Sequence, residues 1–126
     1  MSILSAAFYF EQVHSVYENV KIAYERLNKC MSQLDRQISD IYHDLERYDI
    51  DEAAGYSVAV MLQEALRKRR AVKDELLKLR PIYDLLEHNI GEMDKQYAKA
   101  NKNSANVRRS LNATLTISDI EKEVAF

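Results

Sequence analysis

The fold is decided by residues 10–48, which read FEQVHSVYENVKIAYERLNKCMSQLDRQISDIYHDLERY. Apolar or aromatic residues recur in this stretch at alternating intervals of three and four, and such residues occupy all 12 positions of the series. A repeat that averages 3.5 residues predicts one seam of a long helix in a left-handed coiled coil. The seam residues are Phe10, Val13, Tyr17, Val20, Tyr24, Leu27, Met31, Leu34, Ile38, Ile41, Leu45 and Tyr48.

A second series with the same spacing spans residues 58–100, and Arg69 is the one position of its 13 that is neither apolar nor aromatic. Between the two series, Asp49 and Glu52 have the spacing of a capping box at a helix start. Because the connection is so short, the two helices must fold back antiparallel as a hairpin. The second seam consists of Val58, Leu62, Ala65, Arg69, Val72, Leu76, Leu79, Tyr83, Leu86, Ile90, Met93, Tyr97 and Ala100.

The expected fold class is therefore all-α, a long antiparallel helical hairpin with a short C-terminal helix. Pro81 removes a backbone donor, but the heptad phase passes through it unbroken, which predicts a kinked, continuous second helix. The Asn and Ser residues of 101–106 predict the end of that helix, and Ser118 and Glu121 have the spacing of another capping box. The predicted single domain consists of helix 6–48, turn 49–52, helix 53–101, linker 102–117 and helix 118–125.

Apolar residues beside the seams exceed what a two-helix hairpin can cover. Val16, Ala23 and Cys30 widen the first seam, and Leu66, Leu77, Ile82 and Leu85 widen the second. This surface is expected to meet another copy, the C-terminal segment or a partner protein. A homodimer that forms a four-helix bundle meets the requirement most simply.

Composition excludes several classes of protein. Only 3 of the 126 residues are Gly or Pro, which argues against a turn-rich β-fold, and the single Cys30 excludes an intrachain disulfide framework. The net charge of −2 provides no general attraction to nucleic acid. The chain has no apolar run long enough to span a membrane and no basic leader, so we expect a cytoplasmic protein with no membrane association.

The sequence contains no pattern typical of catalysis: no Ser/His/Asp arrangement, Gly-rich phosphate loop or HExxH motif. Glu11 with His14, and Asp40 with His43, have the i, i+3 spacing of carboxylate-bridged metal sites in helical bundles. The seam residues, however, occupy the inward face beside both histidines. We therefore expect no enzyme activity, no metal site and no cofactor.

Charge is segregated along the hairpin. Residues 35–52 contain seven acids and two bases, whereas residues 67–80 contain seven bases and two acids. In the expected register the numbers of facing residues sum to roughly 103, which places Arg67–Arg70 level with Asp35. Two interpretations stand: ion pairs within or between hairpins, or a binding patch for an acidic protein or a phosphate backbone. Arg69 either reaches a carboxylate and fixes the register, or marks where the bundle opens for a partner.

Tyrosines occupy seam positions where Leu is the usual choice. A buried Tyr hydroxyl needs a hydrogen-bond partner, and Tyr and Arg are enriched among interface hot spots, so the rings serve either as core filler or as a recognition surface. Phe8–Phe10 and the apolar residues of 117–126 are expected to pack together or to form exposed hooks. The residues expected to bind a partner are Arg67, Lys68, Arg69, Arg70, Lys73, Tyr83, Tyr97 and Phe126.

Residues 41–86 resemble small, uncharacterised coiled-coil proteins of Gram-positive phages and prophages. The shared features are Ala53–Tyr56 after an acidic turn, Leu62–Gln63, the basic block Arg67–Arg70, and Lys73–Leu76. The resemblance implies a phage origin and no particular activity. The leading hypothesis is a non-enzymatic, dimeric, protein-binding inhibitor or adaptor that acts on a host or defence protein. The alternatives are a nucleic-acid-associated protein that uses residues 67–80, and a structural scaffold.

Overall fold

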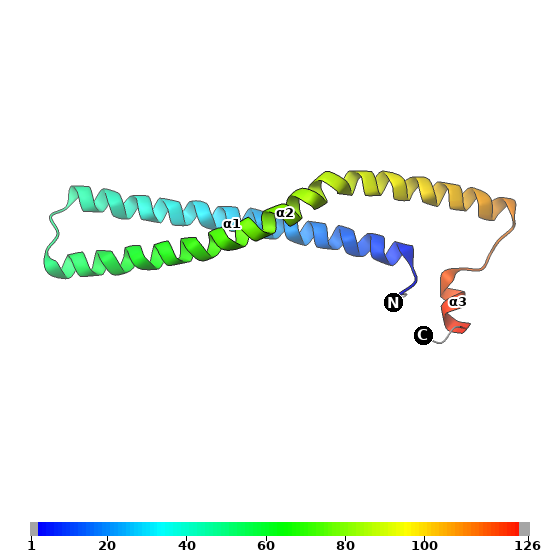
Figure 1. Ribbon diagram of the computed structural model, residues 1–126, viewed down its shortest axis with the longest axis horizontal. Helices are drawn as coiled ribbons and strands as arrows, with labels where there is room; N and C mark the ends of the chain where they lie inside the picture. Colours follow the sequence, from blue (N-terminus) through cyan, green and yellow to red (C-terminus); the bar gives the residue numbers. More distant parts are fainter. Residues whose placement is uncertain (1–2, 124–126) are drawn as a thin grey trace. The chain divides into compact units, whose positions relative to one another are not determined.

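A computed structural model describes residues 3–123 of the chain, and within them every regular element is an α-helix (Figure 1). The elements are α1 (Ala6–Arg47), α2 (Glu52–Ser110) and α3 (Ile117–Glu123). The predicted all-α class is confirmed, because two long helices pack together and a short third helix follows. Phe126 and the last residues of the predicted helix 118–125 lie outside the described residues.

The chain divides into two compact units. Residues up to Asn19 and from Asp84 onward form unit 1, and Val20–Tyr83 form unit 2. Both long helices run without interruption across the division. Pro81 stands within α2, three residues before unit 1 resumes, so the predicted continuity of the second helix through this proline is confirmed.

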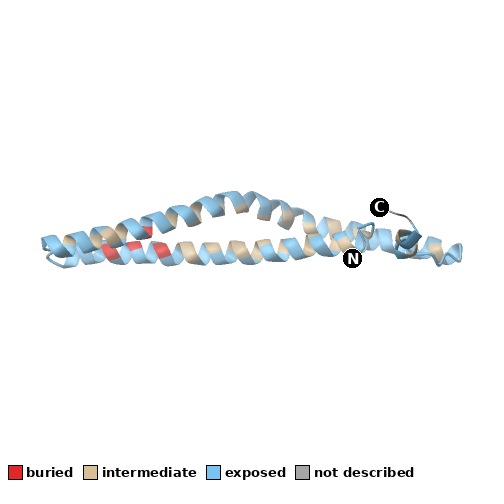
Figure 2. Ribbon diagram, turned by 90° about the horizontal axis from the view of Figure 1, so that it is seen from below, coloured by how far each residue is buried: buried red, intermediate tan, exposed pale blue. Residues whose placement is uncertain are grey.

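Unit 2 is a helical hairpin whose core lies on the predicted seams. The four buried residues among those described are Leu34, Ile38 and Ile41 of α1 and Ala65 of α2, all seam positions (Figure 2). Ala65 is only 1% exposed, and its small side chain lets the two backbones approach closely. Leu45 and Tyr48, the last two positions of the first seam, are 41% and 64% exposed in the single chain, close to the end of α1 at Arg47.

The turn of unit 2 is capped by a different residue from the one predicted. The Asp51 carboxylate accepts a hydrogen bond from the Ala54 amide at 2.7 Å, and the Asp51 carbonyl accepts one from the Gly55 amide at 2.8 Å. Asp51 is therefore the N-cap of α2, and the expected box between Asp49 and Glu52 is not the one formed. Helix α2 begins at Glu52 because Asp51, the residue directly before it, places its carboxylate within reach of a free amide in the first turn.

The end of α2 corrects the predicted linker 102–117. The helix continues to Ser110, and Ala100, predicted to close the seam, is exposed on it. Asn112 adopts a positive φ of 54°. The Ala113 amide donates to the Arg108 carbonyl at 2.8 Å and the Asn112 amide to the Arg109 carbonyl at 3.3 Å. These bonds form a Schellman motif, so Asn112 stops the helix, whereas the earlier Asn and Ser residues are tolerated on its exposed surface.

Helix α3 begins one residue after Thr116. The Asp119 carboxylate accepts hydrogen bonds from the Thr116 amide and the Thr116 hydroxyl, both at 3.0 Å, which together hold the pKa of Asp119 below its usual value. The capping box predicted at Ser118 and Glu121 is instead formed two residues earlier, by Thr116 and Asp119. Glu121 instead accepts a hydrogen bond from the Leu4 amide at 2.8 Å, which joins α3 to the chain start within unit 1.

Candidate binding surfaces

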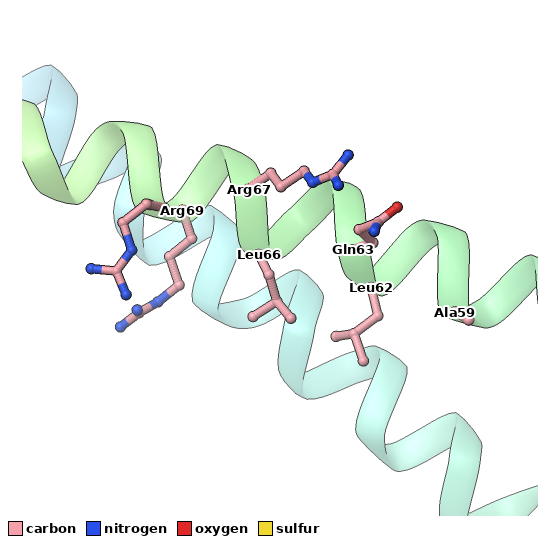
Figure 3. A pocket seen from close by; sticks show the side chains of 7 residues that line it. Ala59, Leu62, Gln63, Leu66, Arg67 and Arg69 are labelled. Carbon is pink, nitrogen blue, oxygen red and sulfur yellow. The ribbon is translucent and has the colours of Figure 1, made fainter.

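Unit 2 carries an open groove along α2, here called the arginine groove. It encloses about 560 Å³ and is lined by Ala59, Leu62, Gln63, Leu66, Arg67, Arg69 and Arg70. In Figure 3 the side chains of Leu62 and Leu66 extend toward α1, whereas Arg67 extends away from it. An apolar floor with a cationic rim favours a ligand that presents apolar groups flanked by negative charge.

Arg69, the exception in the second seam, reaches across unit 2 to a carboxylate. Its Nε donates to Asp35 Oδ1 at 2.7 Å, and the two side chains are 34% and 52% exposed. The interpretation that Arg69 pairs with a carboxylate is confirmed, and so is the expected level of Asp35 beside Arg67–Arg70. Because both groups are partly solvated, the pair adds little stability, and its main effect is on register.

The other cations of the basic block are largely unengaged. Arg67, Lys68 and Arg70 are exposed, and none of the three forms an ion pair with another of residues 3–123. Farther along α2, Lys78 pairs with Glu75 at 3.3 Å on the same helix. Ion pairing within the hairpin, one of the two interpretations of the charge pattern, therefore accounts for Arg69 and leaves its neighbours available to another molecule.

Unit 1 carries a second groove, here called the aromatic groove. It encloses about 290 Å³ and is lined by Ala6, Tyr9, Phe10, Val13, Met93 and Tyr97. The rings of Phe10 and Tyr97 stack with centroids 4.0 Å apart and planes 15° apart. Tyr9 is 51% exposed at its edge, and a smaller pocket of about 70 Å³ shares Val13 and Met93 with it.

Polar contacts hold the two helices of unit 1 together beside this groove. His14 Nε2 pairs with Asp94 Oδ1, and the Tyr17 hydroxyl donates to Glu87 Oε2. The His14 ring also lies 4.7 Å from the ring of Phe10. The contact of His14 with Asp94 was not predicted from the sequence. The signal for it is the antiparallel register, because His14 and Asp94 are polar residues beside the two seams and their numbers place them at nearly the same level.

The remaining expected contact residues are distributed between packing and surface roles. Tyr83 stacks on Tyr24 at 4.6 Å with planes 7° apart, so its ring is part of the packing within unit 2. Lys73 is half-buried beside the arginine groove, and Tyr97 lines the aromatic groove. Of the expected contact residues, the arginine groove thus contains Arg67, Arg69 and Arg70 and the aromatic groove contains Tyr97, whereas Lys68, Lys73 and Tyr83 line neither. Phe126 lies outside the described residues.

The residues that the structure describes show neither a metal-binding cluster nor a membrane-spanning helix. Within residues 3–123 no three His, Cys, Asp or Glu side chains are grouped so that they could bind a metal ion. None of the described helices combines the length and the apolar character required to cross a bilayer. No family model, curated protein or solved structure matches the chain.

Proposed function

We propose that this chain is a non-enzymatic protein-binding module that dimerises and acts as a phage-encoded inhibitor or adaptor. Its partner is a host or defence protein in the bacterial cytoplasm. The phage origin is implied by the resemblance of residues 41–86. The observation that carries the binding function is the aromatic groove of unit 1.

The residues of the aromatic groove have the composition of a protein-binding hot spot. Its lining combines three aromatic rings with Met93, a flexible side chain that adapts to varied partners. Tyr9 lies half-exposed at its edge, and its hydroxyl donates to the Ile3 carbonyl at 2.8 Å, which holds the ring in place. A ring held in advance loses little conformational freedom when a partner covers it.

Exposed apolar residues extend this surface. Ile3 and Leu4 are 54% and 41% exposed, and on α3 Ile117 and Ile120 are 40% and 44% exposed. The bond between Leu4 and Glu121 keeps the chain start beside α3. Exposed apolar residues gathered around a groove are typical of a surface that another protein covers.

Affinity capture from a nuclease-treated lysate of a Gram-positive host tests the proposal with a matched pair of variants. The full-length chain should capture one protein in stoichiometric amount. Tyr9→Glu should lose it, because a partner that covers the groove edge would have to remove water from a charged group, which is costly. Tyr56→Glu is the control, since Tyr56 is 74% exposed and belongs to unit 2. Circular dichroism checks that both variants keep their helices.

Three results would reject the proposal, one of them from a parallel capture without nuclease. Equal capture by both variants would exclude the aromatic groove, and recovery of the bait alone would favour a scaffold. Capture only without nuclease would favour nucleic-acid association through the exposed cations Arg67, Lys68 and Arg70. Together with Arg69 they form four consecutive basic residues that point around most of the helix, which disfavours that alternative.

A further inference from the structure

Acidic and basic residues are segregated along the length of unit 2. Residues 35–66, next to the turn, contain eight acids and two bases, a net charge of −6. The opposite half, residues 20–34 and 67–83, contains ten bases and three acids, a net charge of +7. The contact between Asp35 and Arg69 places the boundary between the halves at the same level on both helices.

The arginine groove lies at this boundary. Its lining residues run from Ala59 to Arg70, so the groove extends from the acidic half into the basic half. Leu62 and Leu66 form its apolar floor, and Leu66 is 44% exposed. Unit 2 therefore has an apolar centre between an acidic half and a basic half, and such an arrangement is self-complementary under a twofold rotation.

We propose that two copies of this chain associate antiparallel through unit 2, with the twofold axis at the arginine groove. This deepens the dimerisation included in the proposed function by naming its surface and orientation. The Leu66 side chains of the two copies meet at the centre, and the acidic half of each copy lies on the basic half of the other. The parallel arrangement is disfavoured because it would bring like charges together.

Residues around the groove support one continuous interface. On α1, Asp35, Tyr42 and Glu46 follow one another at intervals of seven and four, which places them along one side of the helix. Tyr42 is 50% exposed there. Because Asp35 contacts Arg69, this side of α1 adjoins the side of α2 that carries the groove. Leu66 and Tyr42 thus provide apolar and aromatic contact close to the axis, beside the charged side chains at the same level.

The size of unit 2 is sufficient for a specific dimer. Residues 52–83 of α2 extend about 48 Å at the rise of an α-helix, and two helices side by side are about 20 Å wide. One face therefore offers roughly 900 Å², close to the roughly 800 Å² per partner that standard interfaces bury. The seams themselves remain within each hairpin, so dimerisation requires no opening of the core.

Charge reversal on one side of the contact tests the orientation directly. With Leu66 on the axis, Arg67 of one copy lies level with the exposed Glu64 of the other, so the groove variant is R67E and the acid variant is E64K; K95E changes an exposed lysine of unit 1 as a control. Light scattering after size exclusion should find the wild type and the control at twice the chain mass of 14.7 kDa. Each reversal alone should weaken dimerisation by at least roughly 100-fold, because like charges face each other at both contacts.

Mixing the two variants provides the decisive measurement. In a mixed dimer the reversed position 67 faces the reversed position 64 and the native Arg67 faces the native Glu64, so both contacts are complementary again. An equimolar mixture should therefore recover the dimer mass. A wild-type monomer, an unaffected single variant or a mixture that stays monomeric would each overturn the proposal. A wild-type monomer whose groove variant loses a lysate protein would assign the groove to a foreign partner.

The dimerisation test and the capture experiment of the proposed function can fail independently of each other. Loss of dimerisation without loss of the Tyr9-dependent capture would show that the two surfaces act independently. Failure of the capture experiment alone would leave the self-association through unit 2 intact.

Discussion

The two units use the same heptad repeat with different residues and reach different packing. In unit 2 the seam positions near the turn are Leu34, Ile38 and Ile41, which face the small Ala65, and all four are buried. In unit 1 the seam is built from Phe, Tyr, Met and Val together with Leu and Ile, and none of its described residues is buried. Polar contacts such as His14 with Asp94 and Tyr17 with Glu87 hold its helices together instead.

The difference shows that residue size at the seam positions decides whether the heptad repeat forms a filled core or leaves a groove. Branched aliphatic residues opposite alanine fill the space between two helices and exclude water. The stacked rings of Phe10 and Tyr97 fill it incompletely, and a groove remains beside them. Unit 2 therefore provides most of the hydrophobic stabilisation, whereas unit 1 provides the surface proposed to bind a partner protein.

The largest expected effect comes from removing one seam side chain from each unit. Ile41 is 5% exposed, so Ile41→Ala should lower the free energy of unfolding by about 2–4 kcal/mol, through lost burial and an internal cavity. Leu86→Ala in unit 1 should cost only about 1 kcal/mol, since Leu86 is half-buried beside a pocket and water can enter. Urea denaturation followed by helical ellipticity measures both.

Hydrogen exchange of the two variants then assigns each loss to a unit. Ile41→Ala should raise exchange chiefly within residues 20–83, and Leu86→Ala chiefly outside them. Equal losses from both substitutions would contradict the claim that unit 2 holds the core.

Replacing Gly91 by Ala should stabilise unit 1 and so reduce the difference in stability between the two units. A Cβ added at Gly91, in the part of α2 that belongs to unit 1, meets nothing within 4 Å. Gly91→Ala should therefore stabilise the chain by about 1 kcal/mol through helix propensity alone. Gly55→Ala is the control, because its Cβ would lie 3.5 Å from Ile50 near the start of α2, where the gain should be smaller. Thermal denaturation of both variants measures the effect, and a lower midpoint for Gly91→Ala would refute it.

The sequence predicted the elements of the fold well and their ends less well. The helices and their register follow from many seam positions that agree, so an error at one position does not change the result. Each end depends on one or two polar side chains. Asp51 caps α2 although Asp49 offers the same carboxylate, and Asn112 ends the helix although Asn101 and Asn103 precede it. Which of several equivalent residues acts is decided by backbone geometry that periodicity does not contain.

The candidate surfaces were predictable in part for a related reason. The charge segregation and the pairing of Arg69 follow from the register, because an antiparallel hairpin fixes which levels face each other. The two grooves do not, since a groove depends on how completely neighbouring side chains fill space. Tyr83 illustrates the limit: the sequence allowed it to be a contact residue or core filler, and its stacking on Tyr24 assigns it to packing.

A smaller effect is expected from the ion pair of unit 2. A double-mutant cycle with Asp35→Asn and Arg69→Gln should give a coupling free energy below about 1 kcal/mol, because both side chains are partly solvated. The coupling should decrease further in high salt. Lys78 and Glu75, an exposed pair on one helix turn, form the matched control with a still smaller coupling. A coupling of several kcal/mol would mean that this pair contributes to stability as strongly as the buried seam.

The smallest effect concerns pH and the first turn of α3, at the end of unit 1. The Asp119 carboxylate accepts two hydrogen bonds from Thr116, so its pKa in the folded chain lies below the ordinary value of 3.8. The stabilisation of α3 by this contact is therefore complete above the ordinary pKa and is lost as the pH falls through the lowered one. Backbone chemical shifts of residues 116–123, followed between about pH 6 and pH 2, should show α3 loosening at the acidic end. Asp119→Asn should abolish this pH dependence, whereas Glu123→Gln, which removes a carboxylate from the other end of the helix, should retain it. If α3 were instead held mainly by the bond between Glu121 and the Leu4 amide, Asp119→Asn would leave the profile unchanged and Glu121→Gln would alter it.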